Sequence, residues 1–234
     1  MGKYLTYEDF GAKGDGVTDD FEAIIACHED ANKTKTPVKA KDGAKYYIGG
    51  KNASANIMTD TDFGRAEFII DDVKLENIRS HIFTVSSEFQ SYEIDVKSLK
   101  KTDKKLNFPH EGKAYVKIVN SNRKMFIRRS LNLNNGAHAR DAIIVDSDGS
   151  ILTDIDWDFD EVTLATARSV EDTPITIRGG IFRTIANQAE SFYNYHARNF
   201  YIKRSNVTLA DITHYVSGEM DHGAPYEGFF NIWE

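Results

Sequence analysis

The chain of 234 residues contains a single cysteine, Cys27, so it cannot form an intrachain disulfide bond. On a helix, neighbouring residues point to different faces, and the adjacent His28 is therefore not placed to activate this thiol. We expect Cys27 to be a buried, inert side chain rather than a nucleophile. Because proteins without disulfides are also exported, the cysteine count leaves the cellular compartment open.

Long apolar runs are also missing from the sequence. No segment approaches the ~20 consecutive apolar residues that a transmembrane helix needs. Residues 1–4 lead on without the apolar stretch of a signal peptide. The sequence therefore predicts no membrane partner. Three origins stay open: a removed signal, a cytoplasmic protein, and a virion component released by lysis.

Basic residues are outnumbered in this chain. There are 29 Lys and Arg against 36 Asp and Glu, a formal charge of −7. Nucleic-acid binding needs a basic surface, so no nucleic-acid partner is predicted. Two basic runs, residues 97–105 and 123–129, are interpreted as solvated loops and strand faces. The length is sufficient for one or two domains with a sizeable core.

The most informative segment is DFGAKGDGVTDD, residues 9–20. Its three glycines can adopt positive φ, which predicts consecutive tight turns. Asp19 is expected to be the N-cap of a helix, with Glu22 three residues on completing a capping box. The helix should run to about Ala31. Its apolar face is predicted from i, i+3, i+4 and i+7 spacing, and comprises Phe21, Ile24, Ile25 and His28.

The same twelve residues resemble the N-terminal signature of the pectate-lyase-like superfamily. That superfamily includes polygalacturonases, rhamnogalacturonan-degrading enzymes and many bacteriophage tailspikes. The resemblance covers about residues 4–50 and includes the strand-like KYYIGG at 45–50. It implies a mostly β fold, a right-handed parallel β-helix with an N-terminal capping helix. It also implies a carbohydrate-active protein that acts on an extended polysaccharide, although the family uses this segment to cap the solenoid rather than for catalysis.

Three regions are expected along the chain. Residues 1–89 are interpreted as the cap and the first β-helix strands, and residues 163–234 as further β-helix coils. Residues 90–162 are interpreted as a β-rich insertion or subdomain, because alternating apolar residues predict half-exposed antiparallel strands. Irregular early coils of the β-helix are the alternative for this region. Strands are predicted at 66–72, 81–85, 92–96, 114–119, 124–129, 142–146, 173–182 and 229–232. Residues 199–212 are interpreted as two strands separated by a tight turn at 204–206.

The last predicted strand is followed by no closing helix or polar cap. Terminal repeats of a solenoid normally need capping, because an open end exposes an unpaired apolar edge. We therefore expect that this end is covered, either by the remainder of a longer β-helix or by partner chains in a homotrimer.

Most acidic residues have structural explanations. Asp15, Asp19 and Asp20 suit the turn and the helix cap. Asp148-Gly149 predicts a hairpin turn, because the further oxygen ligands of a calcium loop are missing. Four alternating aspartates would share one face of a strand, where solvation is the first interpretation and Ca²⁺ binding the alternative. They are Asp154, Asp156, Asp158 and Asp160. No metal-ligating set is assigned.

The densest mixture of reactive side chains lies in residues 214–228, which we expect to form the long loop of one coil. Glycoside hydrolysis needs two carboxyl groups, and the candidates are Glu219, Asp221 and Glu227. Polysaccharide β-elimination needs a base beside a cation. The base candidates are His214, His222 and Tyr226, and the cations that could neutralise a uronate carboxylate are Arg178 and Arg183. Tyr193 and Tyr195 are candidate platforms for stacking on sugar rings.

Two classes of function follow from the sequence. The first is an enzyme, a glycoside hydrolase or polysaccharide lyase of the kind found in tailspike depolymerases, extracellular or virion-associated. The second is a non-catalytic glycan-binding or structural solenoid module. An enzyme should bring at least two reactive groups of the 214–228 loop together in a groove, whereas a structural module should leave them apart and solvated.

Overall fold

The computed structural model describes residues 3–75, 77–129, 135–190, 195–220 and 226–233. The chain forms two compact units. The first unit comprises Met1–Ser87 and Asp172–Glu234, and the second comprises Glu88–Glu171. No helix among the described residues is both long and apolar enough to cross a membrane.

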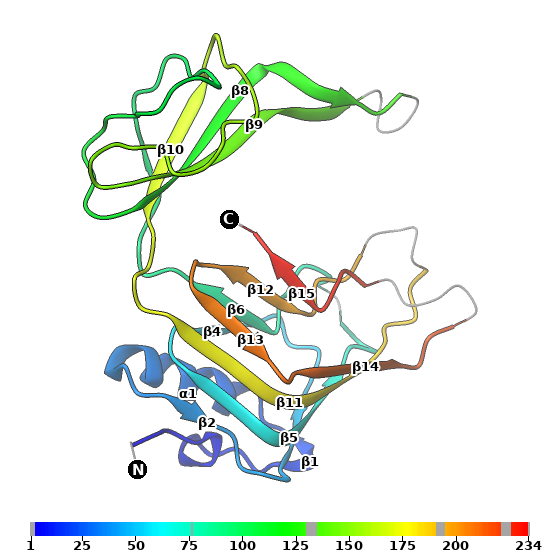
Figure 1. The fold of residues 1–234 in the computed structure, drawn as a ribbon. Helices are drawn as coiled ribbons and strands as arrows, with labels where there is room; N and C mark the ends of the chain where they lie inside the picture. The colour runs from blue at the N-terminus through cyan, green and yellow to red at the C-terminus, as the bar shows by residue number, and fades with distance from the viewer. Residues whose placement is uncertain (1–2, 76, 130–134, 191–194, 221–225, 234) are drawn as a thin grey trace. The chain divides into compact units, whose positions relative to one another are not determined.

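The first unit is built from parallel strands, and helix α1 packs beside the first of them (Figure 1). Its elements are the 3-10 helix η1 (Tyr7–Phe10), helix α1 (Phe21–Thr34) and the strands β1 (Asp15–Asp19), β2 (Val38–Lys39), β3 (Lys45–Ile48), β4 (Ala55–Ile57), β5 (Thr61–Asp71), β6 (Phe83–Ser86), β11 (Ile175–Ile185), β12 (Phe200–Lys203), β13 (Val207–Ala210), β14 (Thr213–Ser217) and β15 (Phe230–Ile232).

These strands pair in three rows. The first row contains β2, the start of β5, the start of β11, and β13. The second row begins with β1 and continues with β3, the rest of β5, the rest of β11, and β14. The third row contains β4, β6, β12 and β15. The chain passes through the rows in the same order four times, and every pairing in the rows is parallel. The predicted mostly β chain with parallel sheets is thus confirmed.

A left-handed residue turns the chain between the first and second rows in each pass. Gly43, Gly64, Gly179 and Asp211 have φ values of 79°, 51°, 74° and 54°. Glycine suits this conformation because it has no Cβ, and aspartate is among the side chains that tolerate it best. The long strands β5 and β11 therefore bend at a glycine and contribute to both rows.

Aromatic rings from successive passes stack inside the three rows. Phe68 stacks on Phe182 with ring centroids 4.7 Å apart, and Phe83 stacks on Phe200 at the same distance. The ring of Phe63 meets these two pairs at the centre of the core. Inward apolar residues alternate with outward polar ones, as strands with one buried face require. The outward side chains of the first two rows are consequently free to form a surface site.

The predicted positive φ angles before α1 are confirmed, but the predicted run of consecutive turns is interrupted by strand β1, which pairs with β3. Gly11, Gly14 and Gly16 have φ values of 97°, 61° and 80°. Of the predicted apolar face of α1, Phe21, Ile24 and His28 are buried and Ile25 is partly buried. The helix continues to Thr34, three residues beyond the predicted end, and closes on Lys35 in the left-handed conformation.

The predicted capping box at Asp19 and Glu22 is wrong. The N-cap of α1 is Asp20, whose side chain makes no capping bond. Its carboxylate instead accepts hydrogen bonds from the backbone N–H groups of Lys13 and Gly14, at 2.6 and 3.0 Å. Asp20 therefore fixes the preceding turn rather than the helix end. Glu22 forms an ion pair with Lys51, and a capping box occurs earlier, between Thr6 and Asp9 of η1.

Burial controls the chemistry of Cys27 and His28. Cys27 is a buried free thiol, as predicted, and burial raises its pKa to about 12. His28 is fully buried, its Nε2 lies 3.0 Å from the hydroxyl of Tyr7, and its Nδ1 has no hydrogen-bond partner. Burial lowers the pKa of His28 to about 3. The imidazole is therefore neutral in the folded chain.

Because His28 is neutral in the folded chain, we expect the free energy of unfolding to fall in mild acid. The unfolded chain gains a proton on His28 below its ordinary pKa of 6.5, whereas the folded chain does not until about pH 3. Stability should therefore fall as the pH falls from 6.5, by up to about 1.4 kcal/mol per pH unit. Urea unfolding at pH 7, 6 and 5 should show a smaller pH dependence for His28→Gln. The exposed His138→Gln is the control, and equal slopes in both variants would contradict this assignment.

The second unit is a four-stranded antiparallel sheet with its own core. Its strands are β7 (Tyr92–Glu93), β8 (Ala114–Ile127), β9 (Gly136–Val145) and β10 (Leu164–Ser169), in the order β7-β10-β8-β9. The unit leaves the first unit after β6 and returns before β11. Its core residues include Leu99, Val116, Ile118 and Ile143.

Two sequence predictions in the second unit have opposite outcomes. The turn at Asp148-Gly149 is confirmed, because Gly149 has a φ of 83° and its N–H donates to the carbonyl of Asp146 at 2.8 Å. The predicted strand face carrying four aspartates is wrong, because residues 153–160 form no strand. Asp158 accepts a hydrogen bond from the backbone of Lys101, and Asp160 pairs with Lys100. Loop contacts, rather than a shared strand face, hold these carboxylates.

Candidate functional site

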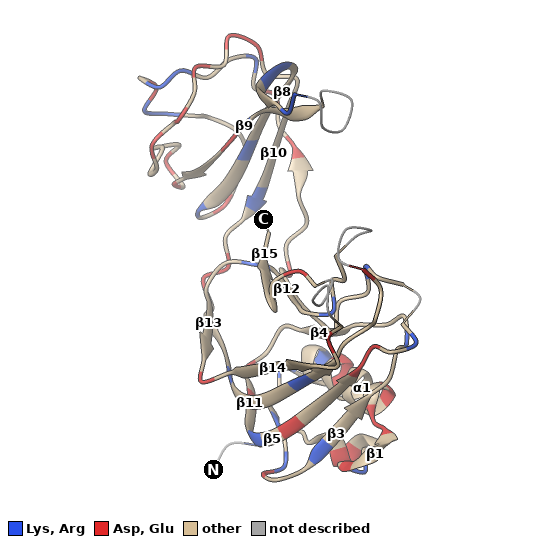
Figure 2. Cartoon of the chain, turned by 90° about the vertical axis from the view of Figure 1, so that its right-hand side faces the viewer, with Lys and Arg blue, Asp and Glu red and all other residues tan. Residues whose placement is uncertain are grey.

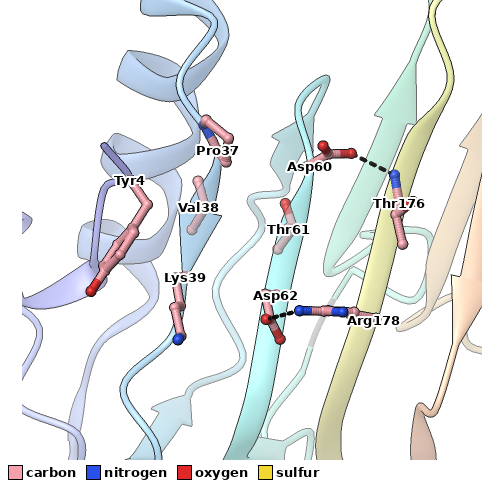
Figure 3. Close-up of a pocket in the computed structure, with 9 residues that line it drawn as sticks. All are labelled: Tyr4, Pro37, Val38, Lys39, Asp60, Thr61, Asp62, Thr176 and Arg178. Carbon is pink, nitrogen blue, oxygen red and sulfur yellow. Dashed lines mark hydrogen bonds and ion pairs between the residues drawn. The ribbon is translucent and has the colours of Figure 1, made fainter. Parts of the chain in front are cut away.

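A surface pocket of about 370 Å³ lies on the first row of strands. Its volume falls within the ~300–1,000 Å³ typical of small-ligand sites. Three strands contribute most of its walls, β2, β5 and β11, and Tyr4 closes one side (Figure 3). The lining residues are Tyr4, Pro37, Val38, Lys39, Asp60, Thr61, Asp62, Thr176 and Arg178.

Parallel register brings the polar groups of this pocket together. Asp62 on β5 lies beside Lys39 on β2 and Arg178 on β11. The Arg178 guanidinium donates to Asp62 Oδ2 at 2.7 Å, and this contact raises the pKa of Arg178. Asp60 accepts a hydrogen bond from the backbone N–H of Thr176 at 2.7 Å. Each side chain is thus oriented by a neighbouring strand and keeps part of its surface exposed.

An aromatic ring and a cation form the other side of the pocket. The Lys39 ammonium lies 5.6 Å from the centre of the Tyr4 ring. The large Tyr4 side chain is 43% exposed, so part of its ring is accessible to a ligand. Figure 3 shows Tyr4 and Lys39 across the pocket from Asp62 and Arg178. The pocket therefore combines a flat apolar surface with two cations, two carboxylates and a phenol hydroxyl.

The second row carries a line of alternating charge next to this pocket. Figure 2 shows basic residues on β3 and β11 on either side of acidic β5. Glu67 forms ion pairs with Lys45 and with Arg183. The Arg183 guanidinium also lies 4.9 Å from the centre of the Tyr215 ring, which is 52% exposed. Arg178 and Arg183 both point outward from β11, but the Gly179-Gly180 corner places them on different rows.

The predicted loop at 214–228 is wrong at its start, because residues 214–217 belong to strand β14 and pair with β11. The described candidates of this segment do not converge. Glu219 is exposed. The Glu227 carboxylate is bound by Arg79 and Asn231, both at 2.9 Å. His214 stacks on Phe229 with ring centroids 3.8 Å apart, and partial burial lowers its pKa to about 4. Asp221 and His222 lie outside the described residues.

The tyrosine candidates occupy different surroundings. The Tyr226 hydroxyl donates to Asp72 at 2.8 Å and accepts from the backbone of Asn187 at 3.0 Å, so it belongs to a buried network. Tyr195 is 54% exposed, and Tyr193 lies outside the described residues. Of the predicted binding residues, Arg178 lies in the pocket and Arg183 on the adjoining charged line.

The described residues offer little for acid–base or metal chemistry. Burial raises the pKa of the Asp72 carboxyl, a property that a general acid needs, but this side chain is fully buried against Arg198. Within the described part of the chain, no group of three or more His, Cys, Asp or Glu side chains could hold a metal ion.

Sequence reasoning missed Tyr4, Lys39, Asp60 and Asp62. The only sequence signal is the alternation Asp60-Thr61-Asp62 ahead of a glycine, which places both carboxylates on the outer face of one strand. Their meeting with Lys39 and Arg178 depends on the register between strands that are far apart in the sequence.

Comparisons with known proteins agree with the parallel strand architecture. No family model and no curated protein matches the sequence. The tailspike gp61 of Pseudomonas phage phi297 is similar in structure, with a TM-score of 0.52 and 14% identity over 93% of this chain. The chain spans 39% of the length of that tailspike. This likeness concerns the fold alone.

Two further solved structures are similar at lower scores. PfbA, a surface adhesin of Streptococcus pneumoniae, has a TM-score of 0.40 and 15% identity, covering 91% of this chain and 33% of the adhesin. The Gp54 tailspike of Acinetobacter baumannii bacteriophage AP22, solved in complex with A. baumannii capsular saccharide, has a TM-score of 0.45 and 9% identity. That match covers 92% of this chain and 36% of the tailspike.

Proposed function

We propose that the first unit is a parallel β-helix of the pectate-lyase-like type that binds an extended surface polysaccharide. The observation that carries the proposal is the pocket formed by Tyr4, Lys39, Asp60, Asp62 and Arg178 on an outward strand face. Four passes through the same three rows support the β-helix, and the N-terminal DFGAKGDGVTDD segment supports the family. A virion-associated or extracellular location accords with this function.

The pocket chemistry suits sugar rings. Carboxylates accept hydrogen bonds from sugar hydroxyls, and the Arg178 fork donates to hydroxyls or to a uronate carboxylate. The exposed face of Tyr4 offers a stacking surface for the apolar side of a pyranose. The strand β11 continues past Gly179 to the charged line that contains Glu67 and Arg183. A long polysaccharide that occupies the pocket could therefore also contact the second row.

The binding proposal predicts a clear effect of Arg178→Ala. On a panel of immobilised bacterial capsular and exopolysaccharides, the wild-type chain should retain at least one glycan, and Arg178→Ala should weaken that binding at least tenfold. The loss of a charge-assisted hydrogen bond, roughly 1.5–3 kcal/mol, accounts for this size.

Arg65→Ala is the matched control for this experiment. Arg65 also lies on β5, and its guanidinium pairs with the carboxylate of Asp42 at 3.3 Å. It does not line the pocket. Its replacement should leave glycan binding within about twofold, as expected for an exposed ion pair. Equal losses of glycan affinity in both variants would show that the pocket is not the binding site.

A second candidate function is cleavage of the bound polysaccharide, as a glycoside hydrolase or lyase. It is favoured by the contact between Arg183 on β11 and Tyr215 on β14, the strand that precedes residues 218–228. The Arg183 guanidinium could neutralise a uronate carboxylate, and the candidate groups Glu219, Asp221 and His222 follow Tyr215 within seven residues of the sequence. Release of reducing ends or of unsaturated uronates from the retained glycan, with calcium and with chelator, distinguishes a depolymerase from a binding module.

A further inference from the structure

The second unit carries a two-stranded ribbon whose composition differs from the rest of the chain. Residues 121–140 contain five Lys or Arg and no Asp or Glu, in a protein with a net charge of −7. The described part of this ribbon, residues 121–129 and 135–140, comprises the outer ends of β8 and β9 and the residues directly beyond them (Figure 1). No residue of this ribbon lines the pocket of the first unit, and among its described residues only Ala139 is a buried member of the core of the second unit.

Apolar side chains on this ribbon are exposed rather than packed. Met125, Phe126 and Ile127 are 37%, 49% and 55% exposed. They are consecutive, so they project from both faces of the ribbon. The basic residues at 123–129 alone indicate a solvated strand face. Such a face does not explain why three consecutive large apolar side chains are exposed to water.

Cations flank these apolar residues. Arg128 and Arg129 are exposed and have no ion pair with any residue that the structure describes. The Lys124 ammonium lies 3.5 Å from Nε2 of His138 on the opposite strand. Arg123 is held separately, over the Trp157 ring and on the carbonyl of Asp158. The available charge is therefore concentrated around Phe126 and Ile127.

The ribbon geometry is enforced by its backbone. Arg128 N–H donates to the carbonyl of Asn135 at 2.9 Å. A Cβ at Gly136 would overlap the carbonyl oxygen of Phe126, so only glycine allows the two strands this close approach. Phe126 is thereby presented on a defined two-stranded support and not on a loose tail.

From these observations we propose that the ribbon binds an anionic lipid surface, with Phe126 and Ile127 entering the acyl boundary and Arg128 and Arg129 contacting lipid phosphates. Apolar insertion combined with basic residues is the composition of interfacial membrane binding. A soluble polyanion offers nothing that would bury Met125 or Ile127. Pairing with another strand is opposed by the basic side chains along the edge, which protect strands from association.

Vesicle sedimentation of the full chain tests this proposal. Vesicles of phosphatidylcholine with one quarter phosphatidylglycerol should bind the protein, and phosphatidylcholine alone should bind it much less. Arg128→Gln with Arg129→Gln should lower partitioning about 25-fold, since each basic residue near an anionic surface contributes roughly fivefold. Phe126→Ser with Ile127→Ser should lower it at least tenfold, through lost apolar contact.

Matched variants in the same unit separate the ribbon from general charge and hydrophobicity. Lys104→Gln with Lys105→Gln removes the same charge from exposed positions elsewhere, and Leu152→Ser with Leu164→Ser removes exposed apolar side chains outside the ribbon. Both control pairs should change partitioning less than threefold. A Phe126→Trp variant should show a blue shift of its fluorescence on the anionic vesicles alone.

Several results would overturn the proposal. These are absence of vesicle binding, equal losses in ribbon and control variants, and binding that requires Arg128 and Arg129 but not Phe126 and Ile127. The last result would indicate a soluble polyanion as the ligand. Ribbon-dependent sedimentation without vesicles would indicate a second copy of the chain. All variants replace exposed side chains, and unchanged melting temperatures would confirm that they fold.

Discussion

Arg198→Met should destabilise the first unit by about 3–5 kcal/mol, the cost of leaving a buried carboxylate without its partner. The Arg198 and Asp72 side chains are completely buried, with Nε and Oδ1 2.8 Å apart. The same guanidinium donates to the carbonyls of Gly49 and Lys51, at 3.0 and 3.4 Å. Asp72 also accepts from Tyr226 at 2.8 Å. This network joins segments from all four passes between the second and third rows.

Chemical denaturation of the wild-type and variant proteins measures this effect. Adding Asp72→Asn to Arg198→Met should recover part of the loss, because the second change removes the unpaired charge. Arg79→Met is the control, since Arg79 pairs with Glu227 at an exposed position, and it should cost at most about 1 kcal/mol. A loss below 1 kcal/mol in Arg198→Met would show that this network does not hold the passes together.

Gly179→Ala is the second change with a large expected effect, a loss of about 3 kcal/mol. Gly179 has a φ of 74°, and a Cβ there would lie 2.7 Å from the carbonyl oxygen of Gly64 on the neighbouring strand. The left-handed conformation costs an alanine roughly 1–2 kcal/mol, and the backbone shift that relieves the clash adds about 1–3 kcal/mol.

Gly43→Ala separates the two contributions. Gly43 has a φ of 79° at the same corner of an earlier pass, but a Cβ there would meet nothing within 4 Å. This variant should lose only about 1 kcal/mol, which is the conformational cost alone. Equal losses in the two variants, measured by urea unfolding, would contradict the close approach of successive corners at Gly64 and Gly179.

The local features of the cap could be predicted because they depend on residues near one another in sequence. The positive φ angles of Gly11, Gly14 and Gly16 and the buried face of α1 follow from glycine freedom and helical spacing. The predicted N-cap at Asp19 is wrong because sequence spacing does not show which backbone groups a carboxylate will bind. Asp20 bonds the turn behind it, at Lys13 and Gly14, in place of the helix ahead.

The pocket could not be predicted because it depends on register. Arg178 was a candidate, but its partner Asp62 lies 116 residues away along the chain, and the second unit is inserted between them. In the same way, Glu227 is a candidate catalytic carboxylate in the sequence, but in the structure it forms an ion pair with Arg79, 148 residues away along the chain. Alternation shows which side chains point outward, whereas strand pairing decides which of them meet.

The measurement that tests the central claim most directly is a crystal structure of the full chain with an oligosaccharide from a retained polysaccharide. We predict a sugar ring against Tyr4, with its hydroxyl or carboxylate groups within hydrogen-bond distance of Arg178 and Asp60. Sugar bound only at the 214–228 loop or only on the second unit, with the pocket empty, would contradict the claim.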